Sequence, residues 1–187
     1  ESKRLGPVNV FLDSPLAQKL TMAVMRYRDS GTDMLKRSNI RFIESVAESK
    51  KLNRMTGIVI IAGSGMCEGG RIRHHLIRNL PNRRSRLLFS GYQVAGTLGS
   101  VLRDGAERVR ISGHDVIVKA QIASLNGYSN HADRSGLVEW IKDRTPISGS
   151  LFLVHGDPSA LESFTEILGD SPDLPAAIVP ALGETWT

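Results

Sequence analysis

The sequence predicts an α/β protein whose first part is a doubly wound, mostly parallel sheet with flanking helices. Short β-branched and apolar runs alternate with segments of helical spacing, and glycines follow the strand-like runs. The sequence texture and the sign of the charge both change near residue 105, which predicts two parts, residues 1–105 and 106–187. No apolar stretch approaches the roughly 18 to 20 residues that span a bilayer, so we expect no membrane segment.

The first predicted elements are a strand and a helix. Residues 8–12 form an apolar run that ends at Asp13. Ser14 is followed by a proline, and this pair predicts a capped helix that continues to about Arg28. Helix capping explains both Asp13 and Ser14, while a chemical role for either residue stays open. The segment 41–50 is predicted to be an irregular or helical connection.

Two further pairs of a strand and a helix complete the first part. Residues 57–62 (G-I-V-I-I-A) form a continuous β-branched run, which is typical of a strand buried on both faces of a parallel sheet. The glycine-rich sequence 63–70 follows and leads into a helix expected to start near Glu68. Residues 87–90 predict another strand, and residues 97–103 predict the next helix.

The second part has shorter predicted strands. They are expected at 109–111 and 116–125, joined by a turn at 112–114, and at 151–154 and 177–179. Two helices are predicted among them. Asp133 caps one helix that runs to about Lys142, and residues 158–168 form the other.

The formal net charge of +5 conceals a strong asymmetry. Residues 1–110 contain twenty Lys and Arg against nine Asp and Glu, whereas residues 111–187 contain four against ten. Six arginines lie close together with no acid among them: Arg71, Arg73, Arg78, Arg83, Arg84 and Arg86. Such a cluster attracts polyanions and contacts phosphates, although a solvated helix face followed by a basic loop has the same composition. Charge alone does not choose among RNA, DNA and an acidic protein surface.

Two short histidine motifs are candidates for chemistry. In V-H-G-D, His155 directly follows the predicted strand 151–154 and precedes a glycine, which is where open α/β sheets place their sites. Neutral imidazole is a good zinc ligand, but one histidine by itself does not establish a metal site. Asp157 opens the next helix, and capping explains it.

In S-N-H-A-D, the residues Ser129, Asn130 and His131 lie in a polar loop just before a predicted helix. Donors at a helix N-terminus form a natural site for a phosphate oxygen, and a histidine there can protonate a leaving oxygen. Asp133 caps the helix or fixes the tautomer of the imidazole. A hydrogen-bonded capping loop without chemistry is the alternative.

The glycine-rich loop 63–70 offers backbone amides that can cradle phosphate. It lacks the lysine of a Walker loop, and Glu68 stands at the third glycine of a dinucleotide motif. Cys67 is expected to be a small buried residue rather than a reactive thiol. His74 and His75 are adjacent on a helix and point in different directions, so they do not form a metal clip.

Five segments in order carry a family resemblance. They are D-S-P-L-A (13–17), S-G-M-C-E-G-G-R (64–71), G-Y-Q-V-A-G-T-L-G (91–99), S-N-H-A-D (129–133) and V-H-G-D (154–157). Together they resemble the β-CASP branch of the metallo-β-lactamase superfamily, most closely prokaryotic RNA-processing nucleases akin to the cleavage and polyadenylation endonuclease. In this family the β-CASP domain is inserted within the lactamase fold. The resemblance implies that residues 1–105 are most of the insert and that residues 106–187 are the C-terminal segment of a lactamase αββα domain.

The resemblance also implies roles for individual residues. His131 matches a histidine that assists proton transfer to the leaving group, and His155 matches a ligand of one of two zinc ions. Ser129 is similar to a position that contacts the substrate phosphate, and Arg71 of the basic cluster is expected to bind substrate as well. Family members that act on RNA tend to have histidine at the position of His155, whereas the DNA-processing branch tends to have valine, which favours RNA as the partner.

The family's H-x-H-x-D-H motif is absent from the sequence, whose five histidines are spaced differently. Zinc sites ordinarily take about four ligands, so one matching histidine does not hold two zinc ions. We therefore expect a C-terminal fragment of a zinc-dependent ribonuclease that is inactive alone and binds no zinc stably. It is expected to expose apolar surface that packs on the missing N-terminal lactamase segment or drives association, such as a homodimer. The single cysteine fits a reducing cytoplasm.

Two other functions fit parts of the sequence. A non-catalytic RNA-binding or scaffold subunit of the same fold would share most of these motifs. Inactive relatives lose the motif histidines, however, and this chain has both His131 and His155. An unrelated α/β nucleotide-binding domain is disfavoured because no workable phosphate-loop motif is present.

Overall fold

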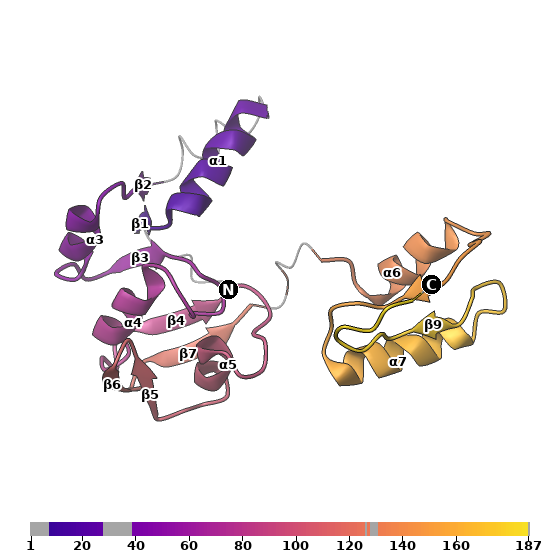
Figure 1. Ribbon diagram of the computed structural model, residues 1–187. Helices are drawn as coiled ribbons and strands as arrows, with labels where there is room; N and C mark the ends of the chain where they lie inside the picture. Colours follow the sequence, from indigo (N-terminus) through magenta and orange to yellow (C-terminus); the bar gives the residue numbers. More distant parts are fainter. Residues whose placement is uncertain (1–7, 28–38, 126, 128–130, 187) are drawn as a thin grey trace, which may run out of the picture. The chain divides into compact units, whose positions relative to one another are not determined.

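The computed structural model describes residues 8–27, 39–125, 127 and 131–186. The chain divides into two compact units, Glu1–Ser129 and Asn130–Thr187, and each is described by itself (Figure 1). In the described ranges no helix is long and apolar enough to cross a bilayer. The strands between residues 108 and 124 fold within the first unit. The predicted boundary near residue 105 concerns family domains rather than compact units, and it stays a prediction.

The first unit is a mixed α/β structure. It contains β1 (Asn9–Leu12), α1 (Pro15–Tyr27), β2 (Ile40–Phe42), α3 (Val46–Leu52), β3 (Ile58–Ile61), α4 (Ile72–Asn79), β4 (Arg86–Phe89), α5 (Leu98–Arg103), β5 (Arg108–Ile111), β6 (His114–Ile117) and β7 (Gln121–Ser124). Strands β2, β1 and β3 pair in parallel in that order, β4 pairs in parallel with β7, and β5 and β6 form an antiparallel hairpin.

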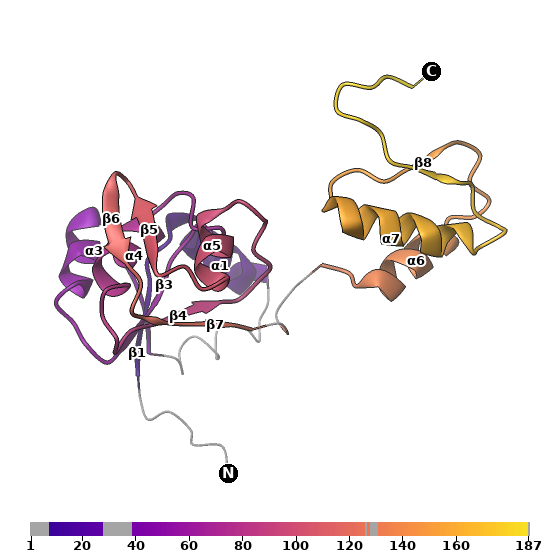
Figure 2. The same cartoon turned by 90° about the horizontal axis from the view of Figure 1, so that it is seen from below.

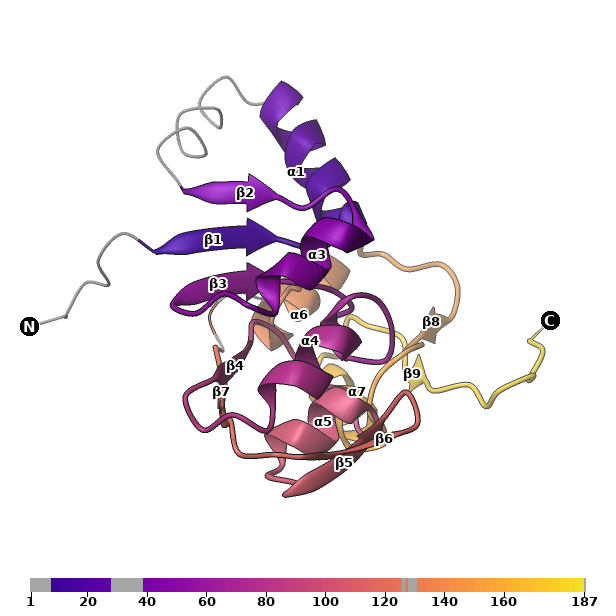
Figure 3. The same cartoon turned by 90° about the vertical axis from the view of Figure 1, so that its left-hand side faces the viewer.

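The parallel sheet β2–β1–β3 sets the geometry of the first unit. Figure 3 shows the carboxyl ends of its three strands at the same edge of the sheet. Helices α1 and α3 lie on opposite sides of this sheet (Figures 1 and 2). The arrangement confirms the predicted α/β class, whereas one continuous doubly wound sheet stays a prediction.

Two apolar clusters stabilise the first unit. The buried side chains of the larger cluster are Cys67, Leu76, Leu80, Phe89, Leu102, Val109, Ile111 and Val116. They come from α4, α5, the β5–β6 hairpin, β4 and the loop before α4. The smaller cluster joins Phe11 of β1 with Ile43 and Leu52. Full burial of such a side chain contributes about 1.5–3 kcal/mol, so these clusters hold the frame from which the loops project.

The segment 41–50, predicted to be an irregular or helical connection, contains the end of β2 and most of the helix α3. Ser45 and Glu48 form a capping box at the start of α3, in which each side chain accepts a backbone N–H of the other's residue. The spacing S-x-x-E is the sequence signal for this cap. A short strand such as β2 gives almost no periodicity, which is why it was not predicted.

Two other expectations about the first unit are wrong. Helix α4 begins at Ile72 rather than near Glu68, because the intervening residues form turns in which Gly70 has a φ of +73°. Strand β3 lies where it was predicted, but it is not buried on both faces. Its alternate side chains Val59 and Ile61 are 42% and 45% exposed, since neighbouring residues of a strand point to opposite faces.

The predicted strand 116–125 is two strands, β6 and β7. Between them, the N–H groups of Lys119 and Ala120 both donate to the carbonyl of Leu80, at 2.8 and 2.9 Å. These bonds redirect the chain from the hairpin to the edge of β4. The hairpin turn consists of Ser112 and Gly113, which have φ values of 50° and 83°, and residue 114 is the first residue of β6 rather than part of the turn.

The second unit contains α6 (Arg134–Lys142), β8 (Leu151–Phe152), α7 (Pro158–Gly169) and β9 (Ala177–Ile178). Strands β8 and β9 pair in parallel, and the N–H of Leu153 extends the pairing by donating to the carbonyl of Ile178 at 2.8 Å. Figures 2 and 3 show α6 and α7 on the same side of this strand pair. All four elements agree with their predicted positions to within about two residues.

Candidate functional site

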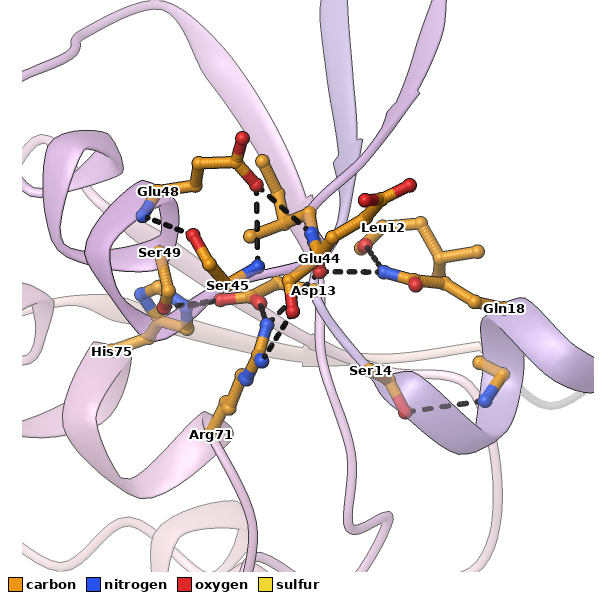
Figure 4. Close-up of polar contacts among 12 residues, drawn as sticks. Leu12, Asp13, Ser14, Gln18, Glu44, Ser45, Glu48, Ser49, Arg71 and His75 are labelled. Carbon is orange, nitrogen blue, oxygen red and sulfur yellow. Dashed lines mark hydrogen bonds and ion pairs between the residues drawn. The ribbon is translucent and has the colours of Figure 1, made fainter.

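A buried polar cluster lies at the carboxyl end of β1 (Figure 4). The side chain of Asp13 is fully buried, with 0% exposure. Its Oδ2 accepts the hydroxyl of Ser49 at 2.5 Å and lies 2.7 Å from Nε2 of His75, and its Oδ1 pairs with the guanidinium of Arg71. We call these four residues the Asp13 cluster. It joins the end of β1 to α3 and to both the start and the body of α4.

The Asp13 cluster also ties the backbone of neighbouring strand ends. The guanidinium of Arg71 donates to the carbonyls of Ile43 and Glu44, at 3.0 and 3.3 Å, just beyond β2. The side-chain amide of Gln18, on α1, donates to the carbonyls of Leu12 and Ile43 at 2.7 and 2.8 Å. Three helices are therefore held to the edge at which the parallel strands end.

The charge of Asp13 is stabilised by its neighbours. Burial raises the pKa of this carboxyl, but hydrogen bonds from Ser49, Arg71 and His75 outweigh burial and hold the pKa below its ordinary value of 3.8. Asp13 is thus a carboxylate at neutral pH. Because no part of it is accessible, it cannot touch a substrate, and the cluster positions the surrounding loops instead.

Arg71, predicted to bind substrate, uses most of its donors inside the protein. Its side chain is 18% exposed and faces Asp13 and two backbone carbonyls. A role in substrate binding stays a prediction. Ser14 caps α1, as predicted, since its Oγ accepts the N–H of Ala17 at 3.4 Å. The carboxylate of Asp13, which capping was also expected to explain, takes part in the Asp13 cluster instead. The signal that points to the cluster is an acidic residue directly after a parallel strand.

The two glycine motifs of the first unit interlock. Met66, in the loop 63–70, accepts the N–H of Gly99 on its carbonyl at 3.1 Å and the N–H of Val94 on its sulfur at 3.3 Å. A carboxylate oxygen of Glu68 accepts the N–H of Leu98 at 2.5 Å, at the start of α5. The segments 64–71 and 91–99 are thus joined by hydrogen bonds within the first unit.

The loop requires glycine where its backbone doubles back. A Cβ on Gly70 would lie 2.4 Å from the carbonyl oxygen of Gly63, and the φ of Gly70 is +73°. Cys67 of the same loop is 2% exposed, which confirms the prediction of a small buried residue. Burial, reinforced by the charge of Glu68, raises the pKa of the Cys67 thiol to about 11. Such a thiol is not a nucleophile at neutral pH.

His131 is an exposed residue just before α6. Asp133 caps that helix, as predicted: its Oδ1 accepts the N–H of Gly136 and the hydroxyl of Ser135, both at 2.9 Å. These hydrogen bonds lower the pKa of Asp133. Ser129 lies outside the described residues, so its predicted contact with a substrate phosphate stays a prediction.

His155 is an exposed residue shortly after β8, and its φ is +69°. The left-handed region is uncommon for a residue other than glycine and is enriched at functional sites. Gly156 lets the turn approach α7, because a Cβ there would lie 3.1 Å from the side chain of Leu161. Asp157 occupies the N-cap position of α7, as predicted, but its side chain makes no capping hydrogen bond.

The described part of the chain does not fit a complete zinc site. Within it, no three His, Cys, Asp or Glu side chains gather closely enough to hold a metal ion. Zinc ordinarily takes about four ligands. The structure places both His131 and His155 in the second compact unit, as exposed imidazoles on two different loops.

Two families of domains match the chain. A Beta-Casp domain matches residues 1–102, and a Zn-dependent metallo-hydrolase RNA specificity domain matches residues 115–172. The second match includes both motif histidines. Each match covers one of the two regions in which the sequence motifs were found.

Named relatives agree with these matches. Ribonuclease TTHA0252 of Thermus thermophilus is 34% identical over 177 residues, which are 88% of this chain and 40% of that protein. Transcription termination factor FttA of Methanocaldococcus jannaschii is 30% identical over 113 residues, 58% of this chain and 18% of that protein. The FttA of Methanosarcina mazei is 29% identical over 119 residues, 61% and 19% of the two chains. The chain spans less than half the length of these curated relatives.

Proposed function

Because this chain belongs to the β-CASP family of nucleases, we propose that it is part of a zinc-dependent ribonuclease that hydrolyses phosphodiester bonds of RNA. The observation that supports this most is the turn at His155, an exposed histidine in a left-handed conformation after a strand end. The turn lies within the match to the Zn-dependent RNA specificity domain. The name of the ribonuclease relative supports RNA as the substrate.

His155 is proposed to bind one of two zinc ions. Its exposure leaves the imidazole open to ligands that come from elsewhere, and a strand end followed by glycine is a rigid place from which to present it. Zinc held by a whole site activates water and stabilises charge on the phosphate.

His131 is proposed to transfer a proton to the leaving oxygen. It lies on an exposed polar loop ahead of α6, where the helix N-terminus favours an anion such as a phosphate. Ser129, two residues earlier in the sequence, is proposed to contact a substrate phosphate. Arg71 is proposed to contribute its remaining exposed edge to the substrate, with its guanidinium fixed by Asp13.

The other zinc ligands are proposed to come from a lactamase segment that carries H-x-H-x-D-H. Apolar surface supports such a partner, because α1 buries none of its residues and Trp140 of α6 is 55% exposed. The same surfaces would serve a homodimer. The chain alone is accordingly proposed to be inactive and to hold no zinc stably. We propose further that residues 1–105 form a doubly wound β-CASP sheet and that residues 106–187 form the end of a lactamase domain. The whole protein is proposed to be cytoplasmic.

The test compares the purified 187-residue chain with a protein that joins it to a lactamase segment of the family. Both are incubated with end-labelled RNA, with and without a zinc chelator. We expect cleavage only by the joined protein, and only without chelator. Robust metal-dependent cleavage by the chain alone would contradict the division of the site. Failure of the joined protein to cut RNA, with zinc bound, would contradict the ribonuclease function itself.

A further inference from the structure

Helices α3 and α4 lie next to each other in the first unit (Figures 1 and 3). Side chains of both helices line a groove. One hollow of about 770 Å³ lies between the exposed sides of the two helices, and β6 begins at its rim. A second hollow of about 410 Å³ follows the ends of both helices. The two hollows share Asn53, Arg78 and Pro81, so together they form one elongated depression. We call it the α3–α4 groove.

The groove is lined by basic side chains and by no acidic ones. Its exposed cations are Lys50, Arg54 and Arg78, and the exposed imidazoles of His74 and His114 lie on its wall. No Asp or Glu lines either hollow. The cations also lack ion-pair partners among the described residues, since the salt bridges found there involve other basic side chains. Their positive charge is therefore unbalanced within the groove.

The inner wall of the groove is rigid. Ser49 and His75 line it and are both held by the buried carboxylate of Asp13. Cations on two helices fixed by one buried cluster keep a constant spacing, which lowers the entropy lost on binding an extended ligand. Apolar side chains of Val46, Ile77 and Pro81 also line the groove and offer contact for sugars and bases.

The elongated shape favours a strand over a single phosphate. Lys50, in the last turn of α3, lines the first hollow, and Arg54, just beyond the end of that helix, lines the second. Arg78 lines both hollows, where they join. Beyond α4, the exposed Arg83 and Arg84 extend the positive charge along the chain into the next loop. A polyanion that follows the groove neutralises several cations at once and releases its counterions.

We propose that the α3–α4 groove binds the backbone of single-stranded RNA, as a second contact apart from the histidine loops. The proposal rests on the proposed function for its choice of RNA, but the groove itself lies within the first unit and requires neither zinc nor catalysis. Its role is to hold the RNA strand by its phosphates. The contact is electrostatic, so it is expected to bind RNA with little preference for sequence.

The test is RNA binding by the purified chain, measured by fluorescence anisotropy with a labelled 20-nucleotide single strand across a salt series. A groove variant carries Lys50→Gln, Arg54→Gln and Arg78→Gln. A control variant removes the same charge from exposed positions outside the groove, with Arg108→Gln, Arg110→Gln and Lys119→Gln. A third variant keeps the groove charge by Lys50→Arg, Arg54→Lys and Arg78→Lys. Thermal unfolding confirms that each variant is folded.

The groove variant is expected to bind the RNA at least about tenfold more weakly at low salt. The slope of log Kd against log salt is expected to fall by about 2, which is about 0.7 for each of the lost phosphate contacts. The control and the charge-preserving variants are expected to bind like the unaltered chain. Equal losses in the groove and control variants would overturn the proposal, and so would absence of binding by the unaltered chain at low salt. Competition by inorganic phosphate as effective as that of RNA would show a small-anion site instead. All of these results measure RNA binding and none depends on RNA cleavage. A failure of the groove proposal can therefore be told apart from a failure of the proposed ribonuclease function.

Discussion

Replacement of Asp13 by asparagine is expected to destabilise the first unit severely. The side chain is fully buried, and it accepts Ser49 at 2.5 Å, contacts His75 at 2.7 Å and pairs with Arg71. Asparagine keeps the shape but removes the charge, which leaves a largely buried guanidinium without its carboxylate. Breaking a buried pair in this way costs about 3–5 kcal/mol, which is a large part of the roughly 5–15 kcal/mol that keeps a domain folded.

The chain contains a matched control for this variant. Asp104 pairs with Arg103 at 2.9 Å, but the two side chains are 62% and 37% exposed. An exposed pair contributes about 1 kcal/mol or less. With a urea m-value of about 2 kcal/mol/M, Asp13→Asn should lower the midpoint of unfolding by roughly 1.5–2.5 M, and Asp104→Asn by less than about 0.5 M.

The assay follows the first unit alone. Cys67 is the single cysteine and is 2% exposed in the core of that unit, so labelling of its thiol after increasing urea reports when the unit opens. Trp140 and Trp186 both belong to the second unit, and their fluorescence provides an internal reference that should not shift. If Asp13→Asn lowered the labelling midpoint no more than Asp104→Asn, the cluster would not be the clamp described above.

Three further predictions follow from the first unit. Gly70→Ala should destabilise the first unit by about 2 kcal/mol or more, because a Cβ at this φ of +73° would lie 2.4 Å from the carbonyl oxygen of Gly63. The control Gly69→Ala, with open space around its Cβ, should cost less than about 1 kcal/mol. Equal urea midpoints for the two variants would refute the steric explanation. Cys67 should resist alkylation at about pH 8 in the folded chain and react fully in urea, since burial raises its pKa to about 11; rapid labelling of the native chain would contradict this. The pKa of Asp13 is lowered by folding from 3.8, so its ionisation stabilises the native state above about pH 4 and this contribution is lost as pH falls through the folded value. The difference in unfolding free energy between the unaltered chain and Asp13→Asn should therefore shrink below about pH 4, and a difference that grew there would show the opposite sign.

The sequence predicts the four described elements of the second unit and, in the first unit, the strands that carry strong apolar runs. Residues 57–62 and 158–168 coincide with β3 and α7, because long β-branched runs and capped helical periods are local signals. The start of α4 was missed because Gly70 and its neighbours form turns whose geometry depends on contacts with the segment 91–99.

The candidate site also combines features that the sequence predicts with features that only the fold reveals. Both histidine motifs could be identified from their order along the chain, and their exposure and position after strands or before helices follow from local structure. The position of Asp13 after a strand is a sequence signal, but its partners could not be predicted, because Ser49, Arg71 and His75 are 36, 58 and 62 residues away in sequence. Capping was a sufficient local explanation of Asp13, and only the fold reveals that its carboxylate points into the protein.

The most direct test of the proposed function is the zinc content of the protein that joins this chain to a lactamase segment, measured alongside RNA cleavage for two variants. His155→Ala is expected to lose bound zinc and cleavage together, since a ligand is removed. His131→Ala is expected to keep its zinc and to cleave RNA about 10²- to 10⁴-fold more slowly, as for loss of a general acid. Full zinc content and unchanged cleavage in His155→Ala would contradict the account.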